Sequence, residues 1–295
     1  MIVMLLVSGE ADTLCAAPIT LNTAMPVAEG EFLFREQFIV DRSADTLGGV
    51  ARDRDVFVSE SLLGYGVNRD LALFAILPYV DKSLDRVQGG VRSSRSAADI
   101  GDLTLFARYT VFRKDWRGRT LRLAPFVGVQ VPTGKDNETD GLGRLPGALQ
   151  PGSGSADALA GMVLTYSTLD FQVDAQTSYK ANTQANNFEF GDVFRLDASL
   201  QYRLWPRSLK GLRGRIPAFV YGVLESNFIH SDNNAVGGAE DPNSGGSSWF
   251  LFPGLQYVTE RWVVEGGVQV PVIQDLNGTG LARDYIVRAG FRFNF

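Results

Sequence analysis

Residues 194–204 read FRLDASLQYRL, and this stretch decides the fold class. Apolar side chains from Phe194 to Leu204 alternate with polar ones from Arg195 to Arg203. Because successive side chains on a strand point to opposite faces, the segment forms a strand with one apolar and one polar face. A helix of the same sequence would scatter its Arg and Asp side chains around the whole cylinder. The segment is therefore predicted to be a β-strand.

The same two-residue period recurs along the chain and predicts twelve strands. In the first three of them, Glu36 and Glu60 do not fit a single polar face, so the sequence leaves the inward side of these strands open. The predicted strands span residues 31–40, 56–67, 71–80, 103–111, 121–131, 157–167, 171–180, 194–204, 218–229, 249–258, 262–272 and 285–295.

Long polar connections alternate with short turns between these strands. In hydrocarbon every backbone polar group needs a partner within the protein, so strands cross a bilayer only as a closed cylinder. Outer-membrane barrels show this rhythm of short periplasmic turns and longer external loops. We therefore predict an all-β fold, a transmembrane antiparallel β-barrel of about 12 strands of the outer-membrane type; a soluble β-sandwich, the alternative, would lack the asymmetry between its ends. The long connections are 41–55, 81–99, 133–156, 181–189, 230–247 and 273–283, and the short turns include 68–70, 114–119, 168–169 and 259–260.

The composition excludes several classes of protein. No apolar run approaches the roughly 20 residues that a helical membrane span needs. The single Cys and single His allow neither a Cys-based zinc site nor a His–His metal site. A net charge of −5 argues against nucleic-acid binding, which needs a basic surface. We expect no metal, no cofactor and no nucleic-acid partner.

The first residues resemble the end of a secretory signal. Met1 to Val7 is apolar, and Cys15, Ala16 and Ala17 place small residues at a cleavage position, although no Lys or Arg precedes the apolar run. We therefore expect a truncated signal peptide at 1–17, an N-terminal periplasmic segment at 18–30 and an outer-membrane barrel at 31–295. The location would be the outer membrane of a Gram-negative bacterium.

Several motifs resemble those of a known family. The aromatic alternation Phe291, Phe293 and Phe295 at the chain end is similar to the C-terminal signal that the barrel-assembly machinery recognises. Several other segments resemble the family known as "MetA-pathway of phenol degradation". They are Pro132 to Gly134, Leu145-Pro146, Leu149 to Ser155, Asp157, Gly161, Ala28 to Glu31 and Phe34 to Gln37. This resemblance implies an outer-membrane transporter and names neither a substrate nor functional residues.

If the apolar faces contact lipid, the alternate side chains line the lumen. They carry both signs of charge, so they can pair with one another and stiffen the barrel, or bind a polar solute. The second interpretation assigns bidentate contacts with carboxylate or phenolate solutes to Arg195, Arg203, Arg288 and Arg292. The predicted lumen residues are Arg108, Gln130, Asp174, Gln176, Lys180, Arg195, Asp197, Gln201, Arg203, Glu225, Glu265, Gln269, Arg288 and Arg292.

An outer-membrane phospholipase is the enzyme alternative. Its chemistry needs a Ser nucleophile that is activated by a His on the same face of the barrel. His230 and Ser231 are adjacent, so on a strand they would point to opposite faces. We therefore assign no catalytic residues and expect that the protein is not an enzyme.

We predict an outer-membrane channel for passive uptake of small organic compounds, aromatic or organic-acid in character. Loop 133–156 is the candidate for a constriction that folds into the pore. The alternative is a non-transporting structural or adhesive barrel. A lumen plugged by side chains would favour that alternative, and an open bore would favour transport. The expected partners are outer-membrane lipid, the barrel-assembly machinery and a small-molecule solute.

Overall fold

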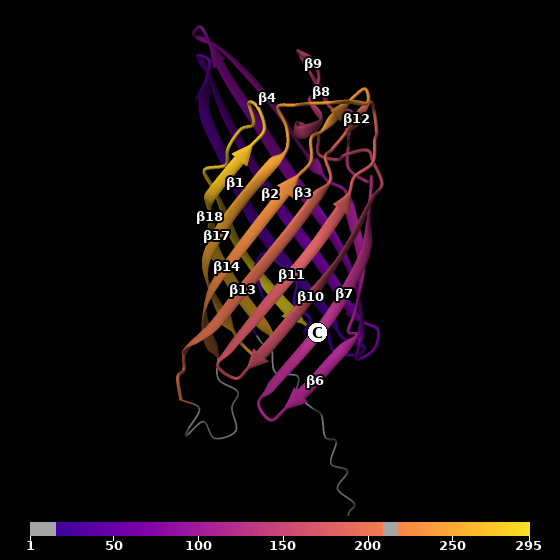
Figure 1. The fold of residues 1–295 in the computed structure, drawn as a ribbon, viewed down its shortest axis with the longest axis vertical. Coiled ribbons are helices and arrows are strands. Elements are labelled where there is room, and N and C mark those ends of the chain that lie inside the picture. The colour runs from indigo at the N-terminus through magenta and orange to yellow at the C-terminus, as the bar shows by residue number, and fades with distance from the viewer. Residues whose placement is uncertain (1–15, 209–217) are drawn as a thin grey trace, which may run out of the picture.

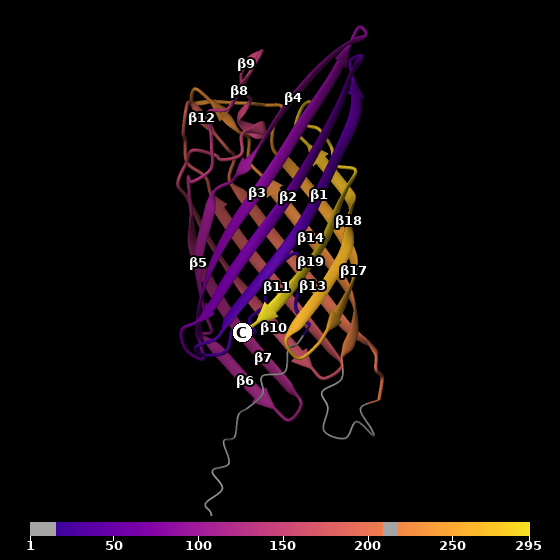
Figure 2. The same cartoon turned by 180° about the vertical axis from the view of Figure 1, so that it is seen from behind.

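Each wall strand pairs with its neighbour in sequence, and the last pairs with the first. In the computed structural model, which describes residues 16–208 and 218–295, β1 (Phe32–Leu47) pairs with β19 (Tyr285–Asn294) and closes the barrel. Figures 1 and 2 show the two sides of this cylinder and the common tilt of its strands. The predicted closed antiparallel barrel is confirmed. The other wall strands are β2 (Val50–Gly66), β3 (Leu71–Gln88), β4 (Val91–Ile100), β5 (Leu103–Tyr109), β6 (Phe112–Trp116), β7 (Arg119–Val131), β10 (Asp157–Thr168), β11 (Phe171–Ala181), β13 (Val193–Trp205), β14 (Phe219–Ser231), β17 (Gly246–Val258) and β18 (Trp262–Leu276).

Three of these segments, β4, β5 and β6, form one broken wall strand. β4 and β5 both pair with β3, and β5 and β6 both pair with β7. The break between β4 and β5 lies at Gly101, where a Cβ would come within 3.0 Å of the Pro78 ring and 3.3 Å of the Pro151 carbonyl oxygen. Counted as one strand, the three segments bring the total to the twelve predicted from the sequence.

Side-chain exposure follows the predicted alternation of faces. Within residues 16–208 and 218–295 no helix has the length and apolar character to cross a membrane. Val127 and Leu196 point outward and are 62% and 54% exposed, whereas Asp197 and Gln201 point inward and are 1% and 0% exposed. The barrel therefore encloses a polar interior and presents an apolar exterior, the arrangement that lipid on the outside requires.

Extended hairpins replace two of the predicted loops. We predicted loops at 41–55 and 81–99, and this is wrong, because β1–β2 and β3–β4 continue to two-residue turns at 48–49 and 89–90. All four turn glycines have positive φ, as the tight turns between twisted strands require. The strands persist because their charges pair across the hairpin: Arg52 lies opposite Asp45, with Nε 2.8 Å from Oδ1. Figure 2 shows these two hairpins side by side at the external end, with the β3–β4 hairpin reaching the highest point of the rim.

The two ends of the barrel differ, as the loop lengths predicted. Among the described residues, the connections at one end are short turns, whereas those at the other end contain secondary structure of their own (Figure 1). In outer-membrane barrels the end with short turns faces the periplasm. The small elements at the opposite, external end are β8 (Thr139–Asp140), β9 (Gly143–Arg144), the 3-10 helix η1 (Gly147–Leu149), β12 (Phe188–Glu189), β15 (Ala235–Val236) and β16 (Ala239–Glu240).

Candidate functional site: the polar lumen

The segment before β1 lies inside the barrel. We expected residues 18–30 to be periplasmic, but Ile19, Ala24 and Val27 are buried against inward-facing wall residues. We call residues 16–28 the arch, because both of its ends lie near the periplasmic turns: Ala16 packs against Val258 and Val263, and Ala28 accepts a hydrogen bond from Glu31 at the start of β1. The predicted signal peptide at 1–17 falls on residues 1–15, outside the described residues, apart from its last two positions.

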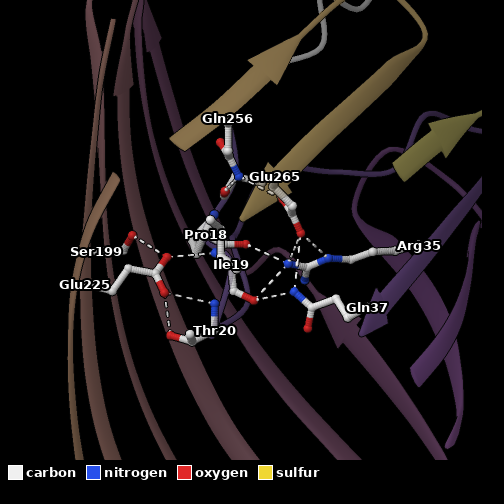
Figure 3. A network of polar contacts seen from close by, with 10 residues as sticks. Pro18, Ile19, Thr20, Arg35, Gln37, Ser199, Glu225, Gln256 and Glu265 are labelled. Atoms are coloured by element: carbon white, nitrogen blue, oxygen red, sulfur yellow. Dashed lines mark hydrogen bonds and ion pairs between the residues drawn. The ribbon is translucent and has the colours of Figure 1, made fainter. Parts of the chain in front are cut away.

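Glu225 on β14 holds the rising limb of the arch. Its carboxylate accepts hydrogen bonds from Ile19 N at 2.7 Å, Thr20 N at 2.9 Å and Thr20 Oγ1 at 2.5 Å. Ser199 Oγ on the neighbouring strand donates to the same carboxylate at 2.9 Å. The Glu225 side chain is fully buried. The arch therefore supplies most of the hydrogen bonds to a carboxylate buried within the lumen (Figure 3).

A second carboxylate, Glu265 on β18, organises the wall two strands away from β14. Arg35 Nε donates to it at 2.8 Å and Gln256 Nε2 at 2.9 Å. Arg35 Nη2 and Gln37 Nε2 also donate to the Ile19 carbonyl oxygen, at 2.8 and 2.9 Å. Both the N–H and the C=O of Ile19 are therefore paired with wall side chains, from β14 and β1 respectively (Figure 3).

Further hydrogen bonds hold residues 22–25, the middle and second half of the arch. Asn22 N donates to Gln176 Oε1 at 2.9 Å, and Ala24 N donates to Thr165 Oγ1 at 2.7 Å. Arg108 Nη2 donates to the Met25 carbonyl oxygen at 2.7 Å. Since these bonds join wall side chains to backbone groups of the arch, they fix its path without covalent attachment.

A cavity of about 460 Å³ lies on the external side of the arch. Lys82 and Lys180 supply cations to its lining, Glu60 and Asp102 supply carboxylates, and Ile76 and Phe190 supply apolar surface. Lys82 Nζ donates to the Gln150 carbonyl oxygen at 2.6 Å, and Lys180 Nζ lies 3.1 Å from Asp157 Oδ2. We call this cavity the chamber; its size and mixed lining are those of a small-molecule site.

Loop 133–156 covers the chamber from outside. Asp102, at the break in the fourth wall strand, accepts hydrogen bonds from Gly134 N at 3.0 Å and from Ser153 N and Oγ, both at 2.7 Å. Arg95 on β4 makes two bonds to Asp140, at 2.7 and 2.9 Å. The Arg95 hydrogen bond, followed by that from Leu142 N, lowers the pKa of the Asp140 carboxyl below its ordinary value. The loop is thus pinned across the mouth of the barrel.

The predicted lumen residues fall into two groups. Arg108, Gln176 and Glu225 contact the arch directly, and Glu265 reaches it through Arg35 and Gln37. The others contact one another or further wall residues: Gln130 with Asp102, Asp174 with Thr165 and Gln172, Lys180 with Asp157, Arg195 with Asp197, Gln201 with Ser199, Arg203 with Asp170, and Gln269 with Asn227 and Arg288. Arg292 is 8% exposed.

Sequence reasoning missed several residues that hold the arch. Arg35 and Gln37 lie on the first strand, whose inward face was left open. Gln256 lies on a strand with apolar residues on both faces, because Phe250 and Phe252 also point inward and are fully buried. No polar period marks such strands in the sequence.

The structure shows which way Glu36 and Glu60 point, the two acidic residues that fitted no single polar face in the sequence. Glu60 lines the chamber and therefore faces inward. Glu36 shares the outward face of β1 with Phe38 and is nevertheless 7% exposed. Its carboxylate accepts hydrogen bonds from Ser59 Oγ and Ser61 Oγ on β2, each at 2.6 Å. A carboxylate on the lipid-facing side is thus covered and fully partnered within its own sheet.

His230 contacts Ser247 rather than the adjacent Ser231. The two residues lie directly opposite on β14 and β17, and His230 Nδ1 is 2.9 Å from Ser247 Oγ. Asp232 Oδ1 is 3.5 Å from Nε2, and both side chains of this ion pair are about half exposed. Among the described residues no group of three His, Cys, Asp or Glu side chains is placed to hold a metal ion.

Comparison with solved structures places the fold among outer-membrane barrels. An outer-membrane channel of the COG4313 group from Pseudomonas putida F1 matches with a TM-score of 0.68 at 11% identity, over 94% of this chain and 100% of that one. The β domain of the Bordetella autotransporter BrkA matches with a TM-score of 0.49 at 12% identity, over 90% and 100%. The NanC porin gives a TM-score of 0.45 at 11% identity, over 89% and 98%.

Comparison with sequences identifies the family. No curated protein sequence gives a significant match. The model of one protein family matches residues 37–273, which is most of the chain and nearly all of the barrel wall. The chain therefore belongs to the family described as "Putative MetA-pathway of phenol degradation".

Proposed function

We propose that the protein is an outer-membrane channel for the passive uptake of small organic compounds, including aromatic and organic-acid solutes. The observation that carries the proposal is the chamber, a partly apolar cavity with two lysines inside a closed barrel. Membership of a family linked by its description to phenol degradation supports an aromatic solute. The P. putida protein of similar fold is itself described as an outer-membrane channel.

A solute would meet two barriers along this path. Loop 133–156 covers the external mouth, and the arch lies below the chamber on the periplasmic side. Lys82 and Lys180 would attract a carboxylate or phenolate, while Ile76 and Phe190 would contact its carbon skeleton. Passage then requires the arch to leave its seat, which breaks hydrogen bonds but no covalent bond. The predicted lumen residues Arg195, Arg203, Arg288 and Arg292 would contact the solute along the lumen.

Two further assignments belong to this proposal. The lipid partner is the outer membrane, which would surround the apolar exterior. The assembly partner is the barrel-assembly machinery, which would recognise Phe291, Phe293 and Phe295 on the last strand; Phe293 and Phe295 are outward and exposed.

The arch also supports the second candidate, a structural barrel that does not transport. Its backbone fills the lumen between Glu225 and Thr165, and side chains close around it. A lumen that stayed filled in this way would carry no solute.

Liposome swelling distinguishes the two functions. Purified protein in liposomes should admit benzoate and phenol faster than a disaccharide of greater bulk, and planar bilayers should show discrete openings. A barrel that gives neither swelling nor openings across phenols, carboxylates and sugars would be structural, and the channel proposal would fail. Liposomes that contain heat-denatured protein provide the baseline.

A further inference from the structure

The hairpin of β6 and β7 at the periplasmic rim segregates its side chains by face. Phe112 lies opposite Leu123, Lys114 opposite Leu121, and Trp116 opposite Arg119. Directly opposite residues of an antiparallel pair share one face of the sheet. The same face of β7 carries Val127 and Val129, which are exposed on the outside of the barrel. Lys114, Trp116 and Arg119 therefore lie on the lipid side of the wall.

The one acidic residue of this hairpin, Asp115, lies on its other face, near Asp70 of the adjacent β2–β3 turn. Arg113 is 3.6 Å from Asp115 and 3.8 Å from Asp70, and Arg122 is 3.9 Å from Asp115. These inward cations are therefore partnered by carboxylates. In the described part of the chain no carboxylate forms an ion pair with Lys114 or Arg119, the two outward cations.

The outward cations instead flank an aromatic ring. Lys114 Nζ and the Arg119 guanidinium carbon each lie 5.0 Å from the centroid of the Trp116 ring, within cation–π range. Two positive charges are thus held against one ring on the lipid side, and no carboxylate of the described residues pairs with either.

The position of this cluster along the barrel axis matches a membrane boundary. Arg119 pairs with Thr168 at the last residue of β10, next to the turn that exposes Leu169. On the same wall, Tyr109, Val111 and Phe112 form an exposed apolar and aromatic strip directly before the cluster. Trp and Tyr residues mark the interfaces of outer-membrane barrels, and the lipid headgroups lie at that level.

We infer that Lys114, Trp116 and Arg119 form a binding site for the phosphate of an anionic phospholipid headgroup in the inner leaflet of the outer membrane. The phosphate supplies a negative charge to Lys114 and Arg119, with which no carboxylate of the described residues forms an ion pair. The acyl chains lie along the apolar strip. Arginine and lysine near a bilayer surface each contribute to attraction of acidic lipid, and the attraction is screened by salt. The site is independent of the lumen and so does not rest on the proposed function.

Native mass spectrometry tests this inference with the full-length protein. The protein in detergent is mixed with equal amounts of phosphatidylglycerol and phosphatidylcholine that carry identical acyl chains. Two double variants are compared with wild type: Lys114→Gln with Arg119→Gln removes the outward charges, and Arg113→Gln with Arg122→Gln removes two charges from the opposite face of the same hairpin. The mobility shift between unheated and heated samples on a denaturing gel verifies that each variant is folded.

Wild type and the inward double variant should both retain phosphatidylglycerol in preference to phosphatidylcholine. The outward double variant should lose about tenfold in this preference, consistent with two lipid-facing cations. An outward variant that keeps the wild-type ratio would overturn the inference. An equal loss in both double variants would also overturn it, since net charge rather than this site would then attract the lipid. If a double variant does not fold, the two corresponding single variants are measured in its place, and the same comparison of outward with inward variants decides.

Discussion

Replacement of Glu225 by Ala should release the arch and raise the open probability of the channel. The carboxylate accepts three hydrogen bonds from the arch, at 2.5–2.9 Å. A hydrogen bond to a charged group contributes about 1.5–3 kcal/mol when buried. Because the three share one carboxylate and water can enter the lumen after the substitution, we take the low end and expect a combined loss of about 3–4 kcal/mol. This corresponds to a shift of roughly 100-fold or more in the ratio of displaced to seated arch.

Single-channel recording in planar bilayers measures this shift directly. Glu225→Gln, which keeps an acceptor but loses the charge, should fall between wild type and Glu225→Ala. Glu60→Ala is the matched control, because it removes an inward glutamate that lines the chamber on the other side of the barrel. Equal open probabilities in wild type and a folded Glu225→Ala protein would refute the reasoning, since the arch would then not be the barrier.

Three further predictions concern the chamber, the external loop and the lipid-facing wall. Lys82→Gln with Lys180→Gln should slow the uptake of benzoate several-fold relative to benzyl alcohol in liposome swelling, because only the anion uses the two cations; an unchanged ratio would contradict the proposed solute site. Arg95→Ala should free residues 139–144 and increase rapid current noise. Since the pKa of Asp140 lies below its ordinary 3.8, the Asp140–Arg95 contact contributes fully above that pH and is lost as the pH falls through the lowered value. Wild-type current should therefore be unaffected between pH 7 and pH 5 and resemble Arg95→Ala only below about pH 4; noise that rises near neutral pH would exclude this pair. Leu200→Lys, on the outward face near the middle of β13, should lower the free energy of unfolding in vesicles by about 2–4 kcal/mol, and Phe194→Lys near the outer boundary by about 0–1 kcal/mol; equal costs in urea titrations would argue against a lipid-facing surface.

The wall of the barrel could be predicted because its signal is local. Strands β11, β13 and β19 alternate clearly within about ten residues, and lipid on one side and a polar lumen on the other enforce that period. The extended hairpins were not predicted because their polar residues, such as Asp45 and Arg52, pair with each other and give no alternation of apolar and polar faces. The Gly48-Gly49 and Gly89-Gly90 pairs were the available signal, since two adjacent glycines between alternating residues predict a tight hairpin.

The arch could not be predicted from its own residues. Residues 16–28 have neither strand nor helix periodicity. Three of their partners, Thr165, Glu225 and Gln256, lie about 140 to 240 residues later in the chain. The wall strands do carry a sign of the arch, because some of their inward-facing residues are apolar. Phe74, Phe106 and Phe126 cover Val27, while Val223 and Phe252 cover Ile19. Inward apolar patches in a polar lumen thus indicate that something else occupies it.

Reversible locking of the arch tests the central claim, that solute crosses the lumen only when the arch leaves its seat. Ala24 N lies 2.7 Å from Thr165 Oγ1, so Ala24→Cys with Thr165→Cys, in a Cys15→Ser background, offers a disulfide between arch and wall. Swelling rates of liposomes in benzoate are compared for the oxidised and the reduced protein. We predict that oxidation lowers uptake at least tenfold and that a reductant restores it. Equal uptake by the fully oxidised and the reduced protein would contradict the claim.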